Sequence, residues 1–208
     1  MAISYPLSLP SVRALTTDWE AVNTAGMNRS PFTGAEQIYA WSGEWWRCSV
    51  SLPPMALADA DAWVAFLVSL RGRYGTFLLG DPLKTSPRGV GTGTPVVAGG
   101  SQTGYSLDTD GWSASTPGIL AAGDWIQLGS GSGSRLHKVV QSADSDSAGA
   151  ATLEIWPALR ASPADNDPIT LASTRGVFRL DGNITSWSVD KARTYGINFT
   201  AVEALGAS

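Results

Sequence analysis

Apolar and polar residues alternate along residues 45–52, which predicts a β-strand. Successive side chains of a strand point to opposite faces, so we expect the even-numbered positions from Trp46 to Leu52 to face a core. Residues 38–41 form another apolar run, and the polar residues 42–44 separate the two runs. This arrangement predicts a β-hairpin that turns at residues 42–44.

Residues 56–71 show the one convincing helical pattern of the chain. Asp59 and Asp61 lie in the early turns, Arg71 in the last turn and Gly72 just after it, as expected from the helix dipole and from glycine C-caps. The pattern therefore predicts a helix with one face on a sheet, followed by a buried strand at residues 75–79. The apolar stripe at positions i, i+3, i+4 and i+7 consists of Trp63, Phe66, Leu67 and Leu70.

The character of the chain changes between residues 83 and 174, where charged residues are fewer and Gly and Ser are more frequent. Short strand-like runs alternate there with turn-forming clusters, which is typical of a small barrel or sandwich. The turn clusters are at residues 108–111, 123–124, 129–134, 144–149 and 162–167. Strong strand patterns return at residues 177–180, 184–190 and 194–205.

These patterns predict a mainly β fold, more specifically a β-rich α+β class. Residues 1–82 and 175–208 are expected to form one domain, a sandwich-like or split-barrel-like sheet with the helix packed on it. Residues 83–174 are expected to form an inserted, peripheral β-rich domain. Residues 1–35 show no lasting period, and we expect an extended arm there with one strand around residues 19–23.

The composition narrows the classes of function. Only 15% of the residues are charged but 43% are hydrophobic, which excludes global disorder. The net charge of −4 provides no basic field, so nucleic-acid recognition and binding to an anionic membrane are disfavoured. No secretory leader pattern and no long apolar run is found, so we expect a soluble chain made in the cytosol. The single cysteine, Cys48, is expected to be a small buried residue.

No motif for catalysis, cofactors or metals is convincing. His137 is the only histidine, and without a nucleophile elbow it is interpreted as a half-exposed strand residue. Residues 144–149 imitate a calcium loop but have Ala148 at the fifth position and Ile155 at the twelfth, so a polar turn is expected. Residues 91–96 lack the helix that a dinucleotide fingerprint needs. The sequence therefore predicts no enzyme, no cofactor and no metal site.

The tryptophans are the strongest candidates for a functional surface. Trp45 and Trp46 are neighbours on one strand and must face opposite sides, so at least one of them is expected to be poorly buried. Three interpretations stay open, namely core, protein interface and platform for a sugar. The candidate interface residues are Trp41, Trp45, Trp46, Arg47 and Tyr74. The candidate sugar contacts are Trp112 and Trp125.

The pattern of apolar and Gly positions resembles that of tail-tip proteins of long, flexible-tailed bacteriophages, the distal tail and minor tail protein families. The shared features are a strand, an alanine-rich helix ending in an aromatic-Leu pair, a Gly-rich turn into Phe and apolar residues before Asp-Pro, and the closing strands. They are found at residues 46–55, 63–67, 72–82, 187–190 and 195–203.

The resemblance implies a structural protein of the virion tail tip, made in the cytoplasm of the host bacterium. Such proteins form a ring, usually of six copies, between the tail tube and the baseplate hub. The ring leaves a channel for the tape measure protein and for DNA, which passes without sequence recognition. Expected partners are therefore further copies of the chain, the tube protein, the hub protein and the tape measure protein, with no membrane. Residues 83–174 depart from the shortest members of the family, although distal tail proteins often have an outward β domain.

Two other functions compete with this hypothesis. A carbohydrate-binding module is suggested by Trp-rich strands in a β-rich chain, and it would use Trp112 and Trp125. A glycosidase or other hydrolase ranks third, because nothing local selects a pair among the 18 acidic residues.

Overall fold

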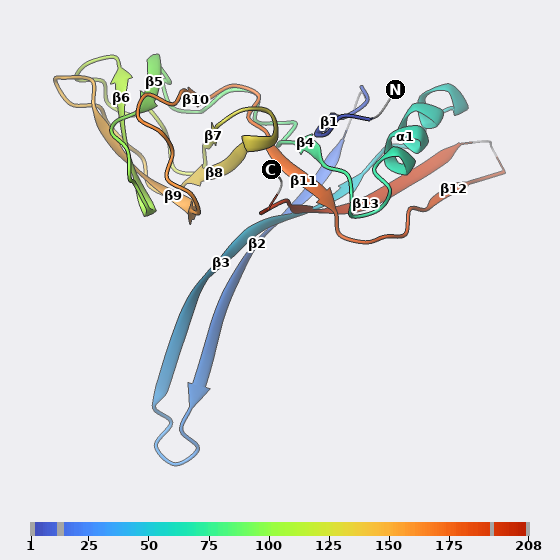
Figure 1. Ribbon diagram of the computed structural model, residues 1–208, viewed down its shortest axis with the longest axis horizontal. Helices are drawn as coiled ribbons and strands as arrows, with labels where there is room; N and C mark the ends of the chain where they lie inside the picture. Colours follow the sequence, from blue (N-terminus) through green and yellow to red (C-terminus); the bar gives the residue numbers. More distant parts are fainter. Residues whose placement is uncertain (1–2, 12–14, 192–193, 207–208) are drawn as a thin grey trace.

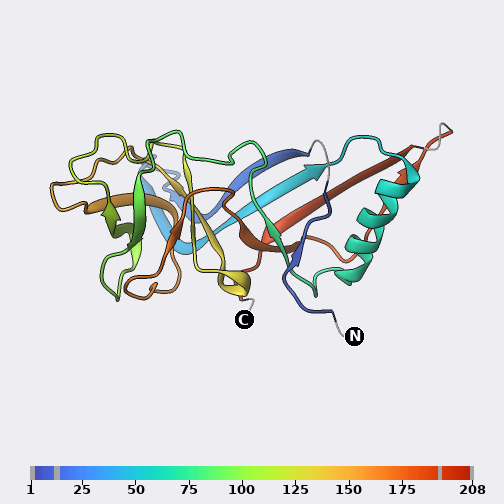
Figure 2. The same cartoon turned by 90° about the horizontal axis from the view of Figure 1, so that it is seen from above.

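The computed structural model describes residues 3–11, 15–191 and 194–206. These residues form two β-sheets and one α-helix, α1 (Leu57–Ser69), so the expected β-rich class is confirmed. Figure 2 shows the six-stranded sheet and α1 at opposite ends of the molecule. The helix is neither long nor apolar enough to cross a membrane, and the described residues contain no other candidate span.

The larger sheet has seven strands, which come from both ends of the chain. Its strand order is β1-β4-β11-β13-β3-β2, with β12 paired to β13. Strand β11 lies between β4, from the first half of the chain, and β13, near its end, because it pairs with both. The strands are β1 (Leu7–Ser8), β2 (Thr16–Arg29), β3 (Glu36–Ser51), β4 (Phe77–Leu79), β11 (Gly176–Leu180), β12 (Trp187–Val189) and β13 (Tyr195–Glu203).

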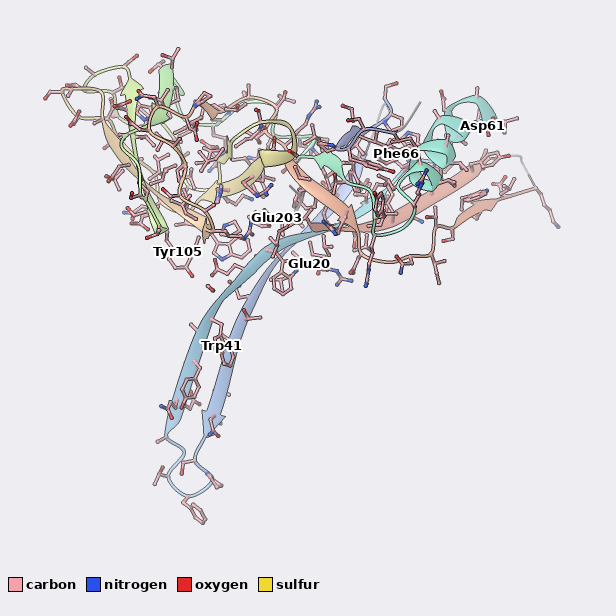
Figure 3. All side chains as sticks on the ribbon, viewed as in Figure 1. Glu20, Trp41, Asp61, Phe66, Tyr105 and Glu203 are labelled. Carbon is pink, nitrogen blue, oxygen red and sulfur yellow. The ribbon has the colours of Figure 1, made fainter. Side chains whose placement is uncertain are left out.

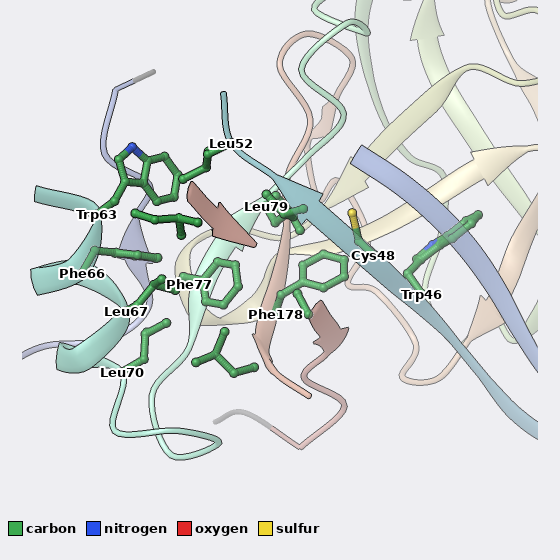
Figure 4. Packing of buried hydrophobic residues seen from close by; sticks show 14 of the residues in the cluster. Trp46, Cys48, Leu52, Trp63, Phe66, Leu67, Leu70, Phe77, Leu79 and Phe178 are labelled. Atoms are coloured by element: carbon green, nitrogen blue, oxygen red, sulfur yellow. The ribbon is translucent and has the colours of Figure 1, made fainter. Parts of the chain in front are cut away.

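Helix α1 packs its apolar stripe on this sheet, as its period predicted. Trp63 and Leu67 are almost fully buried, and the Phe66 ring meets the Phe77 ring edge-on with 5.6 Å between centroids (Figure 4). The helix is slightly shorter than the expected residues 56–71. Arg71 was expected in the last turn, but it follows the helix in the left-handed region with a φ of 53°.

The smaller sheet has six strands in the order β10-β7-β8-β9-β6-β5 and is nearly closed into a barrel. The segment just before β10 meets the end of β5 at Val97, whose N–H donates to the Asp167 carbonyl and whose carbonyl accepts the Asn166 N–H, each at 2.9 Å. All six strands lie within residues 93–170 (Figure 1). They are β5 (Gly93–Val97), β6 (Gly104–Trp112), β7 (Trp125–Leu128), β8 (Arg135–Val139), β9 (Ala151–Leu159) and β10 (Ile169–Thr170).

Two expected turns of this region have different outcomes. Residues 129–134 connect β7 to β8 through a short 3-10 helix, η1 (Gly131–Gly133), so the expected turn is confirmed. Residues 108–111 were expected to turn but lie inside β6, where Asp108 pairs with Thr152 of β9. Asp108 is exposed and Asp110 is half-buried, which a barrel strand allows on its solvent side, whereas Thr109 between them is 1% exposed.

The hairpin expected at residues 42–44 is wrong, because residues 36–51 form one continuous strand, β3. Its partner is β2, which is 14 residues long and pairs from Thr16 opposite Ser51 to Arg29 opposite Glu36. The chain turns at residues 30–35 instead. Gly43 marks a register shift near Thr24, whose Oγ1 donates to the Gly43 carbonyl at 2.6 Å. A bulge of this kind bends a hairpin without ending it.

Candidate interaction surface

The outer half of the β2–β3 hairpin extends beyond the other strands of the larger sheet and away from the smaller sheet (Figure 1). We call residues 25–42 the arm. Every residue from Glu36 to Ser42 is exposed, although these residues belong to a regular strand. A two-stranded hairpin is at best marginally stable in water by itself. The arm therefore gains little stability from contacts of its own.

The arm has large apolar side chains on both of its faces. Phe32, in the turn, is 95% exposed. Trp41, labelled in Figure 3, is 64% exposed. Neighbouring residues of a strand point to opposite faces, so the exposure of both Ile38 and Tyr39 leaves the two faces uncovered. Met27 on β2 is exposed as well. Exposed apolar patches of this kind mark interaction sites.

The sequence fits this local geometry. The Trp41 ring lies across the backbone of Gly26. A Cβ atom at position 26 would be only 3.1 Å from that ring, so a glycine fits this position. Near the turn, Arg29 and Glu36 form an ion pair between paired positions of β2 and β3. The arm thus has an ordered strand pairing and an ion pair but no core of its own.

Trp46 was expected in an interface between molecules, but it is buried inside the chain. Only 5% of it is exposed, and its indole Nε1–H donates to the Leu136 carbonyl of β8 at 3.0 Å. Its ring meets those of Trp125 and Trp156 with centroids 4.7 and 4.4 Å apart. Trp46 therefore joins the two sheets of one molecule, and it is removed from the candidate interface.

The two candidate sugar contacts are also buried. Trp125 is 3% exposed, and the Lys138 Nζ lies 4.1 Å from its ring centroid. Trp112 is 5% exposed, and its Nε1–H donates to Thr109 Oγ1 at 2.8 Å. A sugar stacks on an exposed ring face, so neither residue can serve as a surface platform. The prediction failed because packing between segments distant in sequence decides which face of each strand is covered.

The remaining candidates lie at separate places. Trp45 is half-buried, on the face of β3 opposite Trp46. Arg47 pairs with Asp181 at 2.8 Å, and this hydrogen-bonded contact raises the pKa of its guanidinium. Tyr74 is exposed in the loop after α1, edge-on to Tyr5 with centroids 6.0 Å apart. Of the five expected interface residues, only Trp41 lies on the arm.

A polar cluster around two buried carboxylates, those of Glu44 and Glu203, fixes the root of the arm, where β3 enters the body of the molecule. Glu44 is 7% exposed, and its carboxylate accepts the Tyr105 hydroxyl at 2.7 Å and the Ala158 N–H at 3.0 Å. The hydrogen bond to Glu44 raises the pKa of Tyr105. Tyr105 and Ala158 belong to the smaller sheet, so Glu44 ties the arm to it.

Arg160 extends the same cluster to the larger sheet. Its guanidinium donates to the Glu44 carbonyl at 2.7 Å and to both oxygens of Glu203 at 2.7 Å each. Glu203, at the end of β13, also accepts the Trp46 N–H at 3.1 Å. We call Glu44, Tyr105, Arg160 and Glu203 the junction cluster. Buried charges are stable when they are paired and hydrogen-bonded, so this cluster holds arm and sheets in one arrangement.

The other residues considered for chemistry have structural surroundings. His137 was expected to be half-exposed, but it is buried, with Nδ1 2.8 Å from the Pro157 carbonyl oxygen. Asp146 accepts the N–H groups of Ala148 and Ala150 at 2.8 Å, so the expected polar turn is confirmed. Among the described residues no group of three or more potential ligands could hold a metal ion.

The sequence missed most of the arm. Met27, Phe32, Ile38 and Tyr39 were not recognised, because a strand without a buried face shows no alternation of apolar and polar residues. A usable signal was present in the turn-forming residues 30–34, which include a proline and a glycine. Glu44 was missed because its partners come from distant parts of the chain.

No model of a known protein family matches the chain. A search of curated proteins gives no match either.

Proposed function

We propose that this protein is a structural subunit of the tail tip of a long, flexible-tailed bacteriophage, and that it assembles with copies of itself into a ring. The arm is the observation that supports this proposal. It is a long strand pair with uncovered apolar side chains on both faces, and the junction cluster holds its root in a fixed direction. A monomer gains nothing from such a segment, whereas a neighbouring copy would cover it.

The dimensions of the arm suit a contact with a neighbour. A strand rises about 3.3 Å per residue, so the exposed residues 36–42 reach about 23 Å. Adjacent strands are about 4.8 Å apart, so this length spans four or five strands of another subunit. In such a contact the arm of one copy would meet a different surface, on the body of the next copy. The contact is therefore head-to-tail. Head-to-tail contacts close into a ring when the rotation between neighbouring copies permits it.

The charge balance is consistent with a channel through the ring. The net charge of −4 gives DNA no basic surface to bind, so DNA would pass the channel without being held. In this proposal the ring joins the tail tube to the baseplate hub and surrounds the path of the tape measure protein. The subunit acts by assembly, so the proposal assigns it no catalytic residue and no cofactor.

The experiment compares the wild-type chain with a variant whose arm is shortened. Residues 27–38 are replaced by Asn-Gly, which joins the paired residues Gly26 and Tyr39 through a two-residue hairpin turn. Light scattering after gel filtration and negative-stain electron microscopy report mass and shape. We expect wild-type rings of about six times 21.8 kDa and a monomeric variant.

A matched control replaces an exposed apolar residue outside the arm. Leu83 is 88% exposed and precedes the smaller sheet, so Leu83→Ser should assemble as the wild type does. Assembly of the shortened variant into the same particles would refute the role of the arm. A wild-type chain that stays monomeric alone and does not bind purified tube or hub protein would refute the proposed function.

A further inference from the structure

A cavity of about 370 Å³ opens at one end of the nearly closed six-stranded sheet. Its wall includes Leu128 at the end of β7, Arg135 and His137 of β8, and Leu159 at the end of β9. Mouths of β-barrels are common places for ligands. The arm and the junction described above make no use of this cavity, apart from Arg160, which also lines it.

The alternation along β8 explains why charged and polar groups line this cavity. Leu136 belongs to the core shared with the larger sheet, and Val139 belongs to the core inside the smaller one. Arg135 and His137 share the face of Val139, because strand side chains repeat every second residue. Both residues therefore point to the inside of the barrel, near its open end.

His137 presents a buried hydrogen-bond acceptor to the cavity. Its Nδ1 contacts the Pro157 carbonyl oxygen at 2.8 Å, and a carbonyl can only accept, so Nδ1 holds the proton and Nε2 the lone pair. Burial lowers the pKa of His137 to about 4, so the ring is neutral at pH 7. The ring makes no second hydrogen bond to any described residue. A ligand with an N–H or O–H donor would form a hydrogen bond with the free lone pair of His137 Nε2.

Arg135 presents a cation that lacks an ionic partner. Its Nη1 donates to the carbonyls of Ser132 and Ser134 at 3.2 and 3.0 Å, and within the described chain no carboxylate lies at ion-pair distance from it. Arg160, the other guanidinium of the wall, is already paired with Glu203.

One carboxylate, that of Asp167, also belongs to the wall of this cavity. Its Oδ2 accepts the Ala164 N–H at 2.8 Å, so it is used within its own turn. The free donors of Arg135 match an incoming carboxylate, which an arginine binds through two parallel hydrogen bonds.

We propose that this cavity binds the C-terminal residue of a peptide segment from a partner protein. The terminal carboxylate pairs with Arg135, the N–H of the last residue donates to His137 Nε2, and an apolar side chain lies against Leu128 and Leu159. A sugar acid has the same charge, but sugars stack on aromatic rings, and no Trp, Tyr or Phe is among the described residues of the wall. The proposal is independent of ring formation.

The experiment titrates the wild-type protein with N-acetyl-Ala-Leu, as the free acid and as the C-terminal amide, by calorimetry. We expect the free acid to bind about tenfold or more tightly than the amide, because a hydrogen-bonded ion pair is lost. This comparison uses one folded protein and does not depend on any variant. Equal affinity of the two peptides, or no binding of either, would overturn the proposal.

Further titrations locate the site. Arg135→Gln should remove the difference between acid and amide, and Arg135→Lys should keep part of it. Arg29→Gln, a matched change at the arm, should leave the affinity unchanged. Binding of galacturonate or inorganic phosphate in place of the peptide would overturn the assignment to a peptide. The shortened-arm variant should bind the peptide normally, so the outcome is separate from that of ring assembly.

Discussion

The Arg160 guanidinium and the Glu203 carboxylate form a two-pronged ion pair, with Nη1–Oε1 and Nη2–Oε2 distances of 2.7 Å. The Glu203 side chain is 1% exposed and that of Arg160 is 23% exposed. Removing one partner of such a pair leaves a buried charge uncompensated, which is strongly destabilising. This contact joins the segment after β9 to β13 and thus connects the two sheets.

We expect Arg160→Met to lower the free energy of unfolding by about 3 kcal/mol, measured by urea denaturation. The additional change Glu203→Gln should recover part of this loss, because it removes the orphaned charge and keeps an acceptor for the Trp46 N–H. Arg29→Met breaks an exposed pair and serves as the control, with an effect below about 1 kcal/mol. Equal effects of the two arginine variants would show that the pair with buried Glu203 contributes no more to stability than an exposed pair.

The Cys48 thiol should be unreactive in the native protein. Cys48 is fully buried on β3, and burial raises the pKa of its thiol to about 12. The thiolate is the reactive form, so it is nearly absent at pH 8. We expect no labelling by a disulfide reagent at pH 8 without denaturant and one label per chain in urea. Fast native labelling would show that this part of the sheet opens readily.

The sequence was sufficient wherever one face of an element is buried. The alternation of Trp46, Cys48 and Val50 predicted the inner half of β3, and the stripe with Trp63 and Leu67 predicted α1. In each case one face of the element packs against a single core, so apolar residues recur with the repeat of a strand or of a helix. These elements build the scaffold from which the arm extends.

The arm and the junction cluster could not be found by the same reasoning. The outer half of β3 has no buried face, so apolar and polar residues do not alternate there, and Gly43 was interpreted as part of a turn. The burial of Trp125 depends on Trp46, from a distant strand. Likewise Arg160 and Glu203 meet only through the docking of the two sheets, which local patterns do not encode.

His137 should make the protein less stable as the pH falls below neutral. An exposed histidine has a pKa of about 6.5, whereas that of folded His137 is lowered to about 4 by burial. Between these values the unfolded chain binds a proton that the folded chain does not, so the free energy of unfolding decreases as the pH falls from about 6.5 to 4. The full decrease is about 3 kcal/mol, and below pH 4 this contribution is constant.

The measurement compares the wild type with His137→Gln by urea denaturation at pH 7 and pH 4.5. The variant lacks this titration, so the stability advantage of the wild type should shrink by about 2 to 3 kcal/mol at the lower pH. An advantage that stays constant over this range would mean that the histidine titrates normally in the folded protein. The ring resonances of His137 in an NMR titration provide a direct check.

Substitutions at the arm should separate assembly from folding. Phe32 is 95% exposed, so Phe32→Ser should change the free energy of unfolding of the monomer by less than about 0.5 kcal/mol. The Trp41 ring also lies on Gly26, so Trp41→Ser should cost slightly more, about 1 kcal/mol. In a ring these side chains would be buried, and losing one large aromatic contact weakens an interface by about 2 kcal/mol or more. The concentration for half-assembly should therefore rise about thirtyfold, as measured by sedimentation. Unchanged assembly of both variants would show that the apolar side chains of the arm do not form the contact between subunits.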